Sequence, residues 1–430
     1  MSSDVQQDVA VEYGGWSDEI TQAMATPEFR QDPYPLYARM RREHPVYRSP
    51  QGAWYLTRYA DVEAALPLHD LRKSSDQDRS FRALAAQRGA RERVSTLDER
   101  IKRSMQGADP PDHTRLRKLG NKAFSVRRIQ GLLPRMQAIV DELLDAAIAA
   151  GPTMDLVSAL AYPLPVTVIC ELFGVPSADR PRIRQWSRQL VDQQWSPQLV
   201  DQTLLDPTPE TPERAELAME EFEDYLQDLI RRRRAEPADD LVSALVAVAD
   251  PGDQLTDDEL LSTCFLLLVA GHETAINLIG NGTLALLRHP DQLRRLRDDP
   301  TLICSAVEEL LRYDSPVQIV RRVVVGAVDV GRQMLGDGDF VFCVLGAANR
   351  DPDRFTDPDG LDLGRPDNRH VSFGYGPHFC LGAPLARLEG EVAIGTLVRR
   401  FPGLRLDTDV VEWRLLNAGL RGLACLPVTY

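Results

Sequence analysis

The chain has 430 residues, with 50 lysine and arginine residues against 64 aspartate and glutamate residues, which gives a formal net charge of −14. This acidic balance argues against general nucleic-acid binding, which depends on positive charge. The length would allow two or three domains. However, no repeat, low-complexity segment or Gly/Ser-rich linker divides the chain, and its 43% hydrophobic residues can fill one large core. We therefore expect a disordered tail over residues 1–16 and a single domain over residues 17–430.

The sequence predicts a cytoplasmic protein without a membrane span. Residues 1–16 are polar and have neither the basic start nor the apolar run of a signal peptide. The most apolar stretch, residues 265–270, is far too short to cross a bilayer. The cysteines are widely scattered and lack the paired spacing of a metal site, as is typical of a protein in the reducing cytosol; they are Cys170, Cys264, Cys304, Cys343, Cys380 and Cys425.

In chain order, the hydrophobic pattern is mostly helical. A helix follows Pro35 and ends before Pro45, residues 54–57 have the composition of a short strand, and helical spacing resumes over residues 60–66. Further helices are predicted over residues 134–150, 165–173, 179–194, 212–235 and 257–288, and a strand over the valine-rich residues 323–330. The expected fold class is mainly α with a small β region.

One long segment, residues 67–111, has weak periodicity and little apolar content. Between residues 72 and 103, ten lysine and arginine residues outnumber five acidic ones. In a compact domain, so long an irregular segment is usually a lid or a binding loop. It is either a solvated surface loop or a substrate-access loop suited to acidic or carrier-bound substrates.

The main chemical signal is a single cysteine between a glycine-rich loop and the start of a helix. Gly374 and Gly376 allow backbone angles closed to other residues, and Gly382 permits close approach to a large flat partner. Pro384 marks the first turn of the following helix. Cys380 therefore lies just before a helix N-terminus, where amide groups and the helix dipole favour a thiolate over a thiol.

These residues form the pattern Phe373-Gly-x-Gly-x-His378-x-Cys380-Leu-Gly, which resembles the haem-ligand loop of the soluble bacterial cytochromes P450. The resemblance implies haem b, with Cys380 as the iron ligand and further cofactor contacts from Phe373, Gly374, His378 and Gly382. It also implies the single-domain P450 fold: a triangular helical body with a long central helix and small antiparallel sheets. In that fold, the helices over residues 179–194 and 212–235 and their loop, residues 195–211, form a roof that opens for substrate.

A second set of residues suits the carboxylates of a cofactor. His113 and Arg117 are four residues apart and so share one face of a helix, which Asp112 or a neighbour is able to cap. The resemblance places both residues against the haem propionates. Arg322 fits another family position that reaches a propionate, and Arg321 is its rival one residue away.

The same helix begins a basic run. Residues 113–128 carry six lysine and arginine residues and no acidic residue, which is unusual in a chain of charge −14. This run is either an ordinary charged surface or a docking face for an acidic partner. The resemblance supplies the partner type, a small ferredoxin that delivers electrons on the thiolate side.

The helix predicted over residues 257–288 is roughly 48 Å long at the standard rise and would cross the whole domain. Its middle reads Ala270-Gly271-His272-Glu273-Thr274-Ala275. Ala270 and Gly271 remove side-chain bulk, and we expect the helix to loosen or kink here. This stretch resembles the family's oxygen-activation motif, in which Glu273 and Thr274 would supply protons and Ala270 and Gly271 would border the cofactor. Ala275 replaces the frequent Thr or Ser, which argues against an extended hydroxyl relay.

Two more family landmarks follow. Glu309 and Arg312 lie three apart on a short helix and resemble the Glu-x-x-Arg motif, with Arg365 as the third member of a structural ion-pair group. The resemblance also predicts that the segment before Arg322 lines the substrate pocket, through Val317, Gln318, Ile319 and Val320.

The resemblance implies a haem-thiolate monooxygenase that inserts one oxygen atom from O2 into a C–H bond or an alkene of a small molecule. Electrons are expected to come from NAD(P)H through a separate ferredoxin reductase and ferredoxin. The pattern is most similar to P450s that tailor polyketides, macrolides or peptides, and the substrate is either free or carrier-bound. The alternatives are a xenobiotic or terpenoid hydroxylase and a P450 that performs oxidative coupling or dehydrogenation.

A P450-like module that only recruits a carrier protein should lack the thiolate and the acid–alcohol pair, whereas this chain keeps Cys380, Glu273 and Thr274. We further expect a monomer with no nucleic-acid or membrane partner.

Overall fold

The computed structural model describes residues 16–24, 26–50, 52–73, 100–194, 211–247, 255–408, 411–414 and 419–430. The predicted tail lies outside these residues except for Trp16. Residues 74–99 of the possible access loop (67–111) and residues 195–210 of the roof loop (195–211) also lie outside them, so the roles of both loops stay predictions.

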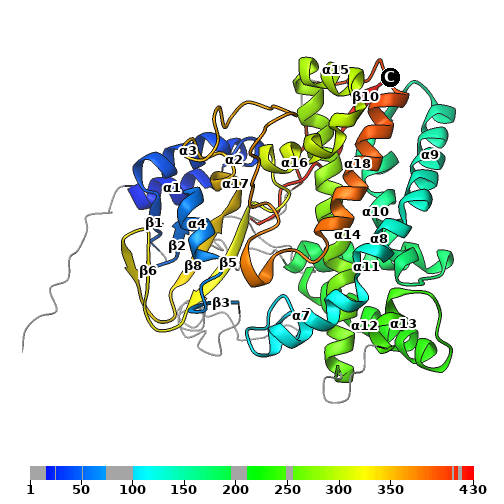
Figure 1. Ribbon diagram of the computed structural model, residues 1–430, viewed down its shortest axis with the longest axis horizontal. Coiled ribbons are helices and arrows are strands. Elements are labelled where there is room, and N and C mark those ends of the chain that lie inside the picture. Colours follow the sequence, from blue (N-terminus) through cyan, green and yellow to red (C-terminus); the bar gives the residue numbers. More distant parts are fainter. Residues whose placement is uncertain are drawn as a thin grey trace, which may run out of the picture.

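The central element is helix α14 (Asp257–Arg288), which crosses the helical body (Figure 1). Its start is fixed by a capping box, in which the side chains of Thr256 and Glu259 each accept a hydrogen bond from the other residue's backbone N–H. By length and composition α14 could cross a membrane, but 72% of its most apolar window is buried inside the protein, as in a core helix. It remains α-helical through residues 270–275, so the loosening expected there is not seen.

Helices from distant parts of the chain pack around α14 (Figure 1). The most extensive contacts with α14 come from α10 (Pro163–Leu172), α12 (Thr211–Ala235), α16 (Ile303–Tyr313) and α18 (Ala383–Arg400), and some of the outer helices also touch it. The outer helices are α7 (Asp112–Ala123), α8 (Val126–Gly131), α9 (Leu133–Ala150), α11 (Arg180–Gln194), α13 (Leu241–Ala247) and α15 (Pro290–Asp298). The apolar faces of most of these helices form the largest hydrophobic cluster, while α15 and α16 contribute to a second one, as predicted for a mainly α fold.

A smaller β region lies beside the helical body, together with α1 (Trp16–Met24), α2 (Pro27–Gln31), α3 (Tyr34–Glu43) and α4 (Tyr59–Ala65) (Figure 1). Its five-stranded sheet has the order β1 (Val46–Arg48), β2 (Trp54–Leu56), β8 (Phe340–Val344), β5 (Ile319–Val324) and β3 (Leu71–Arg72). The remaining strands are β4 (Thr153–Asp155), β9 (Arg405–Leu406) and β10 (Pro427–Thr429) in one sheet and β6 (Val328–Val330) and β7 (Gln333–Leu335) in another. Short helices lie at Val157–Ala161, Ser177–Asp179, Pro300–Leu302, Leu345–Ala348 and Gly376–His378.

Two expectations about the β region were wrong. The sheets are not all antiparallel, because β2 and β8 pair in parallel; the long chain between them removes the need for a tight turn. The strand predicted over residues 323–330 is divided between β5 and β6, which belong to different sheets. Gly326, with a φ of 82°, turns the chain between them.

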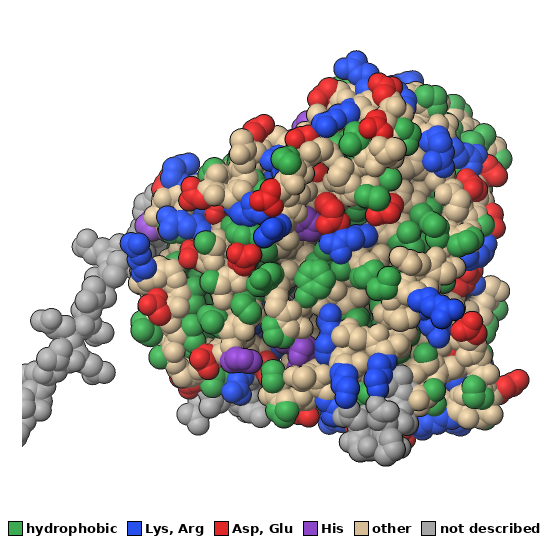
Figure 2. Space-filling view, viewed as in Figure 1, with side chains coloured by type: hydrophobic (Ala, Val, Ile, Leu, Met, Phe, Trp, Pro, Cys, Tyr) green, Lys and Arg blue, Asp and Glu red, His purple; other side chains and the backbone are tan. Residues whose placement is uncertain are grey.

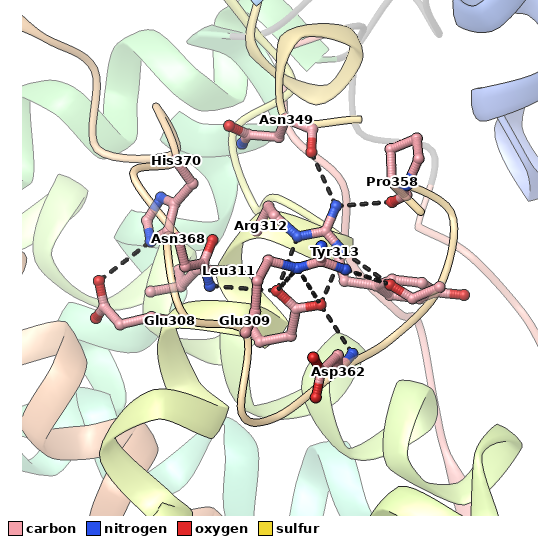
Figure 3. A network of polar contacts seen from close by, with 12 residues as sticks. Glu308, Glu309, Leu311, Arg312, Tyr313, Asn349, Pro358, Asp362, Asn368 and His370 are labelled. Carbon is pink, nitrogen blue, oxygen red and sulfur yellow. Dashed lines mark hydrogen bonds and ion pairs between the residues drawn. The ribbon is translucent and has the colours of Figure 1, made fainter. Parts of the chain in front are cut away.

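The predicted Glu309–Arg312–Arg365 group is present at the end of α16. The Glu309 carboxylate lies 2.8 Å from Arg312 Nε and 3.0 Å from Arg365 Nε. Arg312 also donates hydrogen bonds to the carbonyl oxygens of Asn349, Pro358 and Gly360 (Figure 3). One buried guanidinium thus ties α16 to the chain that leads towards residue 373.

Replacing Glu309 should therefore be costly. Glu309→Gln leaves the Arg312 side chain, which is 0% exposed, buried without its counter-charge, and we expect a loss of about 3–5 kcal/mol in the free energy of unfolding. Urea denaturation followed by circular dichroism measures this loss. Glu142→Gln is the control, since its carboxylate pairs with Arg135 at the surface and should contribute less than about 1 kcal/mol. Equal losses in both variants would contradict the prediction.

Candidate active site

The loop before α18 closes tightly around Cys380. Gly374 and Gly376 have φ angles of 73° and 75°, which only glycine adopts readily. A Cβ on Gly376 would lie 2.9 Å from a side-chain carbon of Pro67. The Cys380 N–H donates a 2.9 Å hydrogen bond to the carbonyl oxygen of Phe373. These features fix the cysteine at the point where the loop enters the helix.

The Cys380 side chain reaches solvent, yet protein atoms enclose it on most sides. This burial raises the pKa of the thiol. The Gly382 N–H, the charge of Arg117, the Ala383 N–H and the charge of Arg387, in that order, lower it by a smaller amount. The amides at the helix start lower the pKa of the thiol as expected, but desolvation outweighs them, so the helix start does not by itself favour a thiolate. A bound metal ion would supply the positive charge that stabilises the thiolate.

The small residues of α14 have two different surroundings. Ala270 is exposed, although its neighbours Val269 and His272 are buried. Its small side chain therefore faces open space in the middle of a core helix. Gly271 differs, because a Cβ there would lie 3.1 Å from Ile169 Cδ1 of α10. Its missing side chain allows close packing of α14 on α10, and its predicted contact with the cofactor stays a prediction.

The acid and alcohol of α14 point in different directions. The Glu273 carboxylate is 2% exposed and its Oε2 lies 2.6 Å from Arg414 Nη1. Glu273 Oε1 has no hydrogen-bond partner among the described residues. The half-buried Thr274 hydroxyl lies 3.4 Å from the carbonyl oxygen of Ala270, one turn back on the helix. Successive residues on a helix are about 100° apart, so Thr274 shares the face of Ala270 while Glu273 faces the C-terminal segment.

Arg414 was not predicted from the sequence. It lies 141 residues after Glu273, in a segment with no motif, so no sequence signal pointed to it. His272 is also engaged away from the open space. Its Nδ1 donates to the Leu268 carbonyl and its Nε2 accepts from the Ser187 hydroxyl, both at 2.8 Å. Burial lowers the pKa of His272 and keeps it neutral.

The structure brings together the cationic residues predicted to bind carboxylates. The rings of His113 and His378 lie 4.0 Å apart, and His113 is only 3% exposed, with no partner for Nε2 among the described residues. Arg322 is 2% exposed and its Nε also lacks a partner there. Arg117 belongs to the same group, since its charge acts on both His378 and Cys380.

Strand geometry places Arg322 and Arg321, the two candidates for propionate contact, on opposite faces of β5. Side chains alternate along a strand, so Arg322 shares a face of β5 with Val320, whereas Arg321 lies on the face of Ile319 and is stacked over the Phe340 ring. Lys73 is a member that sequence reasoning missed. It lies in a segment read as irregular, and its charge acts on His113, His378 and Arg322.

These groups repel one another electrostatically. Burial, together with Lys73, His113, Arg322 and Arg117, lowers the pKa of His378 to about 2. Burial, Arg322 and Arg321 lower the pKa of Lys73, and Asp109 only partly opposes this. A buried cationic cluster in which His113 Nε2 and Arg322 Nε have no partner among the described residues calls for an anionic ligand. Together with a thiol that needs a metal, this donor set fits an iron porphyrin with two carboxylates.

Comparison with known proteins agrees with this geometry. The model of the family described as Cytochrome P450 matches residues 80–413. The chain belongs to the cytochrome P450 family. Proteins of this family hold haem through a cysteine thiolate, take electrons from redox partners and oxidise small molecules. This P450 is therefore a haem-dependent monooxygenase.

The similarity extends over nearly the whole chain. Cytochrome P450 107B1 of Saccharopolyspora erythraea is 45% identical over 407 residues, which cover 93% of this P450 and 95% of that protein. The 6-deoxyerythronolide B hydroxylase of the same organism is 41% identical over 417 residues, covering 94% and 98%. The crystal structure of P450BioI in complex with a hexadec-9Z-enoic acid-ligated acyl carrier protein superposes with a TM-score of 0.82 at 36% identity, covering 94% and 99%. These matches establish the single-domain P450 fold.

The predicted substrate-lining segment of this P450 needs correction. Gln318 is buried, donates to the carbonyl oxygen of Ser315 at 2.7 Å and packs against Gly346. Ile319 belongs to the apolar cluster formed with the N-terminal helices. Val317 and Val320 alone in this segment are partly exposed. Because Gln318 and Ile319 are buried against other parts of the protein, only Val317 and Val320 of the four remain candidates for substrate contact.

The basic run is only partly available as a docking surface. Asp112 makes no capping hydrogen bond, contrary to expectation, because Pro111 occupies the N-cap position. Arg115 pairs with Glu259 of α14, and Arg128 lies 3.6 Å from Asp239. Lys118 and Lys122 are exposed on α7. Helix α7 lies in the lower centre of Figure 1, and Figure 2, drawn from the same side, shows lysine and arginine side chains in that region.

The assignment of Cys380 can be tested by absorption spectroscopy. Cys380→Ser should remove the thiolate-type band of the reduced carbon monoxide complex, because a serine hydroxyl is not a thiolate donor. Cys304→Ser, at an exposed cysteine of α16, is the control and should keep the band. A thiolate-type band in Cys380→Ser would refute the assignment.

Proposed function

We propose that this P450 hydroxylates or epoxidises a secondary metabolite of the polyketide, macrolide or peptide type in the cytoplasm. Electrons would come from NAD(P)H through a ferredoxin reductase and a ferredoxin, and the enzyme would act as a monomer. The observation that carries this proposal is the buried cationic cluster beside Cys380, in which Arg117 interacts with both the sulfur and the histidines. This arrangement can hold a haem at its iron and at its carboxylates simultaneously.

The chain's own residues define three tasks. Cys380 would ligate the iron, and His113, Arg117, Arg322 and His378 would bind the propionates through charge-assisted hydrogen bonds, with Lys73 nearby. Thiolate-ligated haem supplies the chemistry that cleaves the O–O bond of dioxygen. Phe373, Gly374 and Gly382 shape the loop on the thiolate side, and Ala270 leaves space on the opposite side.

Proton supply falls to Glu273 and Thr274. Arg414 holds one carboxylate oxygen of Glu273 and Oε1 has no partner among the described residues, so Oε1 would accept and release the proton. Thr274 presents its hydroxyl on the face of Ala270, from which it would donate a proton towards the side of a bound haem that faces α14. Because the two side chains diverge around the helix, a water molecule between them completes the proposed relay.

The relay predicts uncoupled turnover when the hydroxyl is lost. Thr274→Ala should still consume NADPH but should convert several-fold less of it into product, because protons no longer reach the reacting oxygen in order. Measuring NADPH oxidised against product formed gives the coupling. The control is Thr283→Ala on the same helix, where the hydroxyl donates to the Ile279 carbonyl in the core. Wild-type coupling in Thr274→Ala would remove the residue from the mechanism.

The substrate class is supported by the 6-deoxyerythronolide B hydroxylase among the relatives. The acyl-carrier complex of P450BioI supports a carrier-bound variant of the proposal. A macrocyclic polyketide lactone should shift the haem to high spin, and the spectral change should saturate as the lactone concentration rises, which gives a dissociation constant. A terpenoid of similar mass and a fatty acyl carrier protein serve as comparison ligands in the same titration. If only the terpenoid shifts the spectrum, the polyketide assignment fails.

The ferredoxin proposal rests on the exposed lysines of α7. Charge reversal at Lys118 and Lys122 should slow the first electron transfer from an acidic ferredoxin several-fold, and more at low ionic strength, because salt screens such attraction. Stopped-flow reduction under carbon monoxide measures this rate. Arg42→Glu, an exposed charge on α3, is the control. If the charge-reversal variants at Lys118 and Lys122 are reduced at the wild-type rate, α7 is not the docking face.

A further inference from the structure

Glu308 forms a second ion-pair group directly next to the structural one. Its carboxylate accepts two hydrogen bonds from Arg387 of α18, at 2.6 and 3.0 Å. It also lies within hydrogen-bond distance, 3.2 Å, of His370 Nε2. Figure 3 shows the pair of Glu308 and His370 beside the Glu309 network. Glu308 and Arg387 are each about one-third exposed, at 29% and 33% of their side chains.

The protonation states in this group are defined by their partners. The Ser372 N–H donates to His370 Nδ1 at 3.2 Å, so the Nε2 atom carries the proton that faces Glu308. Burial opposes ionisation of Glu308, but its contacts with His370 and Arg387 outweigh burial and lower the pKa of its carboxyl to about 2. Glu308 is therefore a carboxylate at neutral pH.

Arg387 places a positive charge against the cysteine loop. It lies seven residues after Cys380 on α18, and its guanidinium carbon is 4.6 Å from the centre of the Phe373 ring. The carbonyl oxygen of Phe373 accepts the Cys380 N–H. An electrostatic interaction also links Arg387 to Cys380, although it is weaker than that of Arg117 with the same sulfur. Glu308 thus holds this guanidinium in place and partly neutralises it at the same time.

We propose that Glu308 and Arg387 are positioning residues that set the reduction potential of the haem held by Cys380. Reduction adds one negative charge to the iron–thiolate unit, and a nearby positive charge stabilises that product. Arg387 therefore raises the potential, and Glu308 limits the increase by its opposite charge. The inference rests on the proposed ligation by Cys380 and assigns a function to residues outside the cationic cluster.

Opposite shifts in the two single variants are the decisive result. Arg387→Gln should favour the oxidised enzyme by about threefold in the reduction equilibrium, which is about 30 mV at 59 mV per tenfold for one electron. Glu308→Gln leaves Arg387 uncompensated and should favour the reduced enzyme by a similar factor. The double variant should lie close to wild type, because the charges are removed together.

The measurement is a dye-mediated redox titration of the purified haem-loaded enzyme, which needs no redox partner. Arg400→Gln is the matched control. Arg400 lies on α18 like Arg387, roughly 20 Å further along the helix at 1.5 Å per residue. Its replacement breaks ion pairs with Asp141 and Asp145 of α9. Arg387→Lys keeps the charge and should recover most of the wild-type potential.

Shifts of the same sign in both single variants, or none, would overturn the proposal, since a merely structural role does not depend on the sign of the charge. If Arg387→Gln and Glu308→Gln bind no haem, the test uses Arg387→Lys instead. A shift in its reduction potential no larger than the shift in Arg400→Gln supports the proposal, and a larger shift refutes it. A wild-type enzyme without the thiolate-type band would instead refute the ligation by Cys380.

Discussion

The charge balance around Cys380 is the constraint on which the site depends. Enclosure by protein raises the pKa of the thiol and, by the same desolvation, lowers those of His113, His378 and Lys73. Each group is driven towards its neutral form until a partner of complementary charge arrives. A haem brings both partners at once, a metal for the sulfur and carboxylates for the cations. Cofactor binding and the ionisation of this site are therefore coupled.

Two adjacent glutamates on α16 support that site from different sides. Adjacent helix residues are about 100° apart, so Glu309 faces Arg312 and Arg365 in the core, while Glu308 faces His370 and Arg387 at the cysteine loop. The first group fixes the path of the chain before the loop. The second places a charge beside the loop itself. A short helix thus connects the stability of the fold to the electrostatics of the thiolate.

The middle of α14 shows a similar division of tasks by helix geometry. Ala270 and Thr274 share one face, which borders open space. Gly271 permits contact with α10, and Glu273 pairs with Arg414 from the end of the chain. One turn of helix therefore provides the space, the packing contact and the acid. Each side chain has a different environment because each points to a different neighbour.

The sequence alone determined the features that depend on nearby residues. The glycines around Cys380, the length of α14 and the Glu309–Arg312 pair follow from backbone freedom, hydrophobic period and helix spacing, which act over a few residues. Only the tertiary structure decided that Arg414 holds Glu273, that Lys73 joins the cationic cluster and that Gln318 and Ile319 are buried against other parts of the protein. These outcomes depend on burial and on charges that meet across more than a hundred residues of chain, and neither quantity exists before the chain folds.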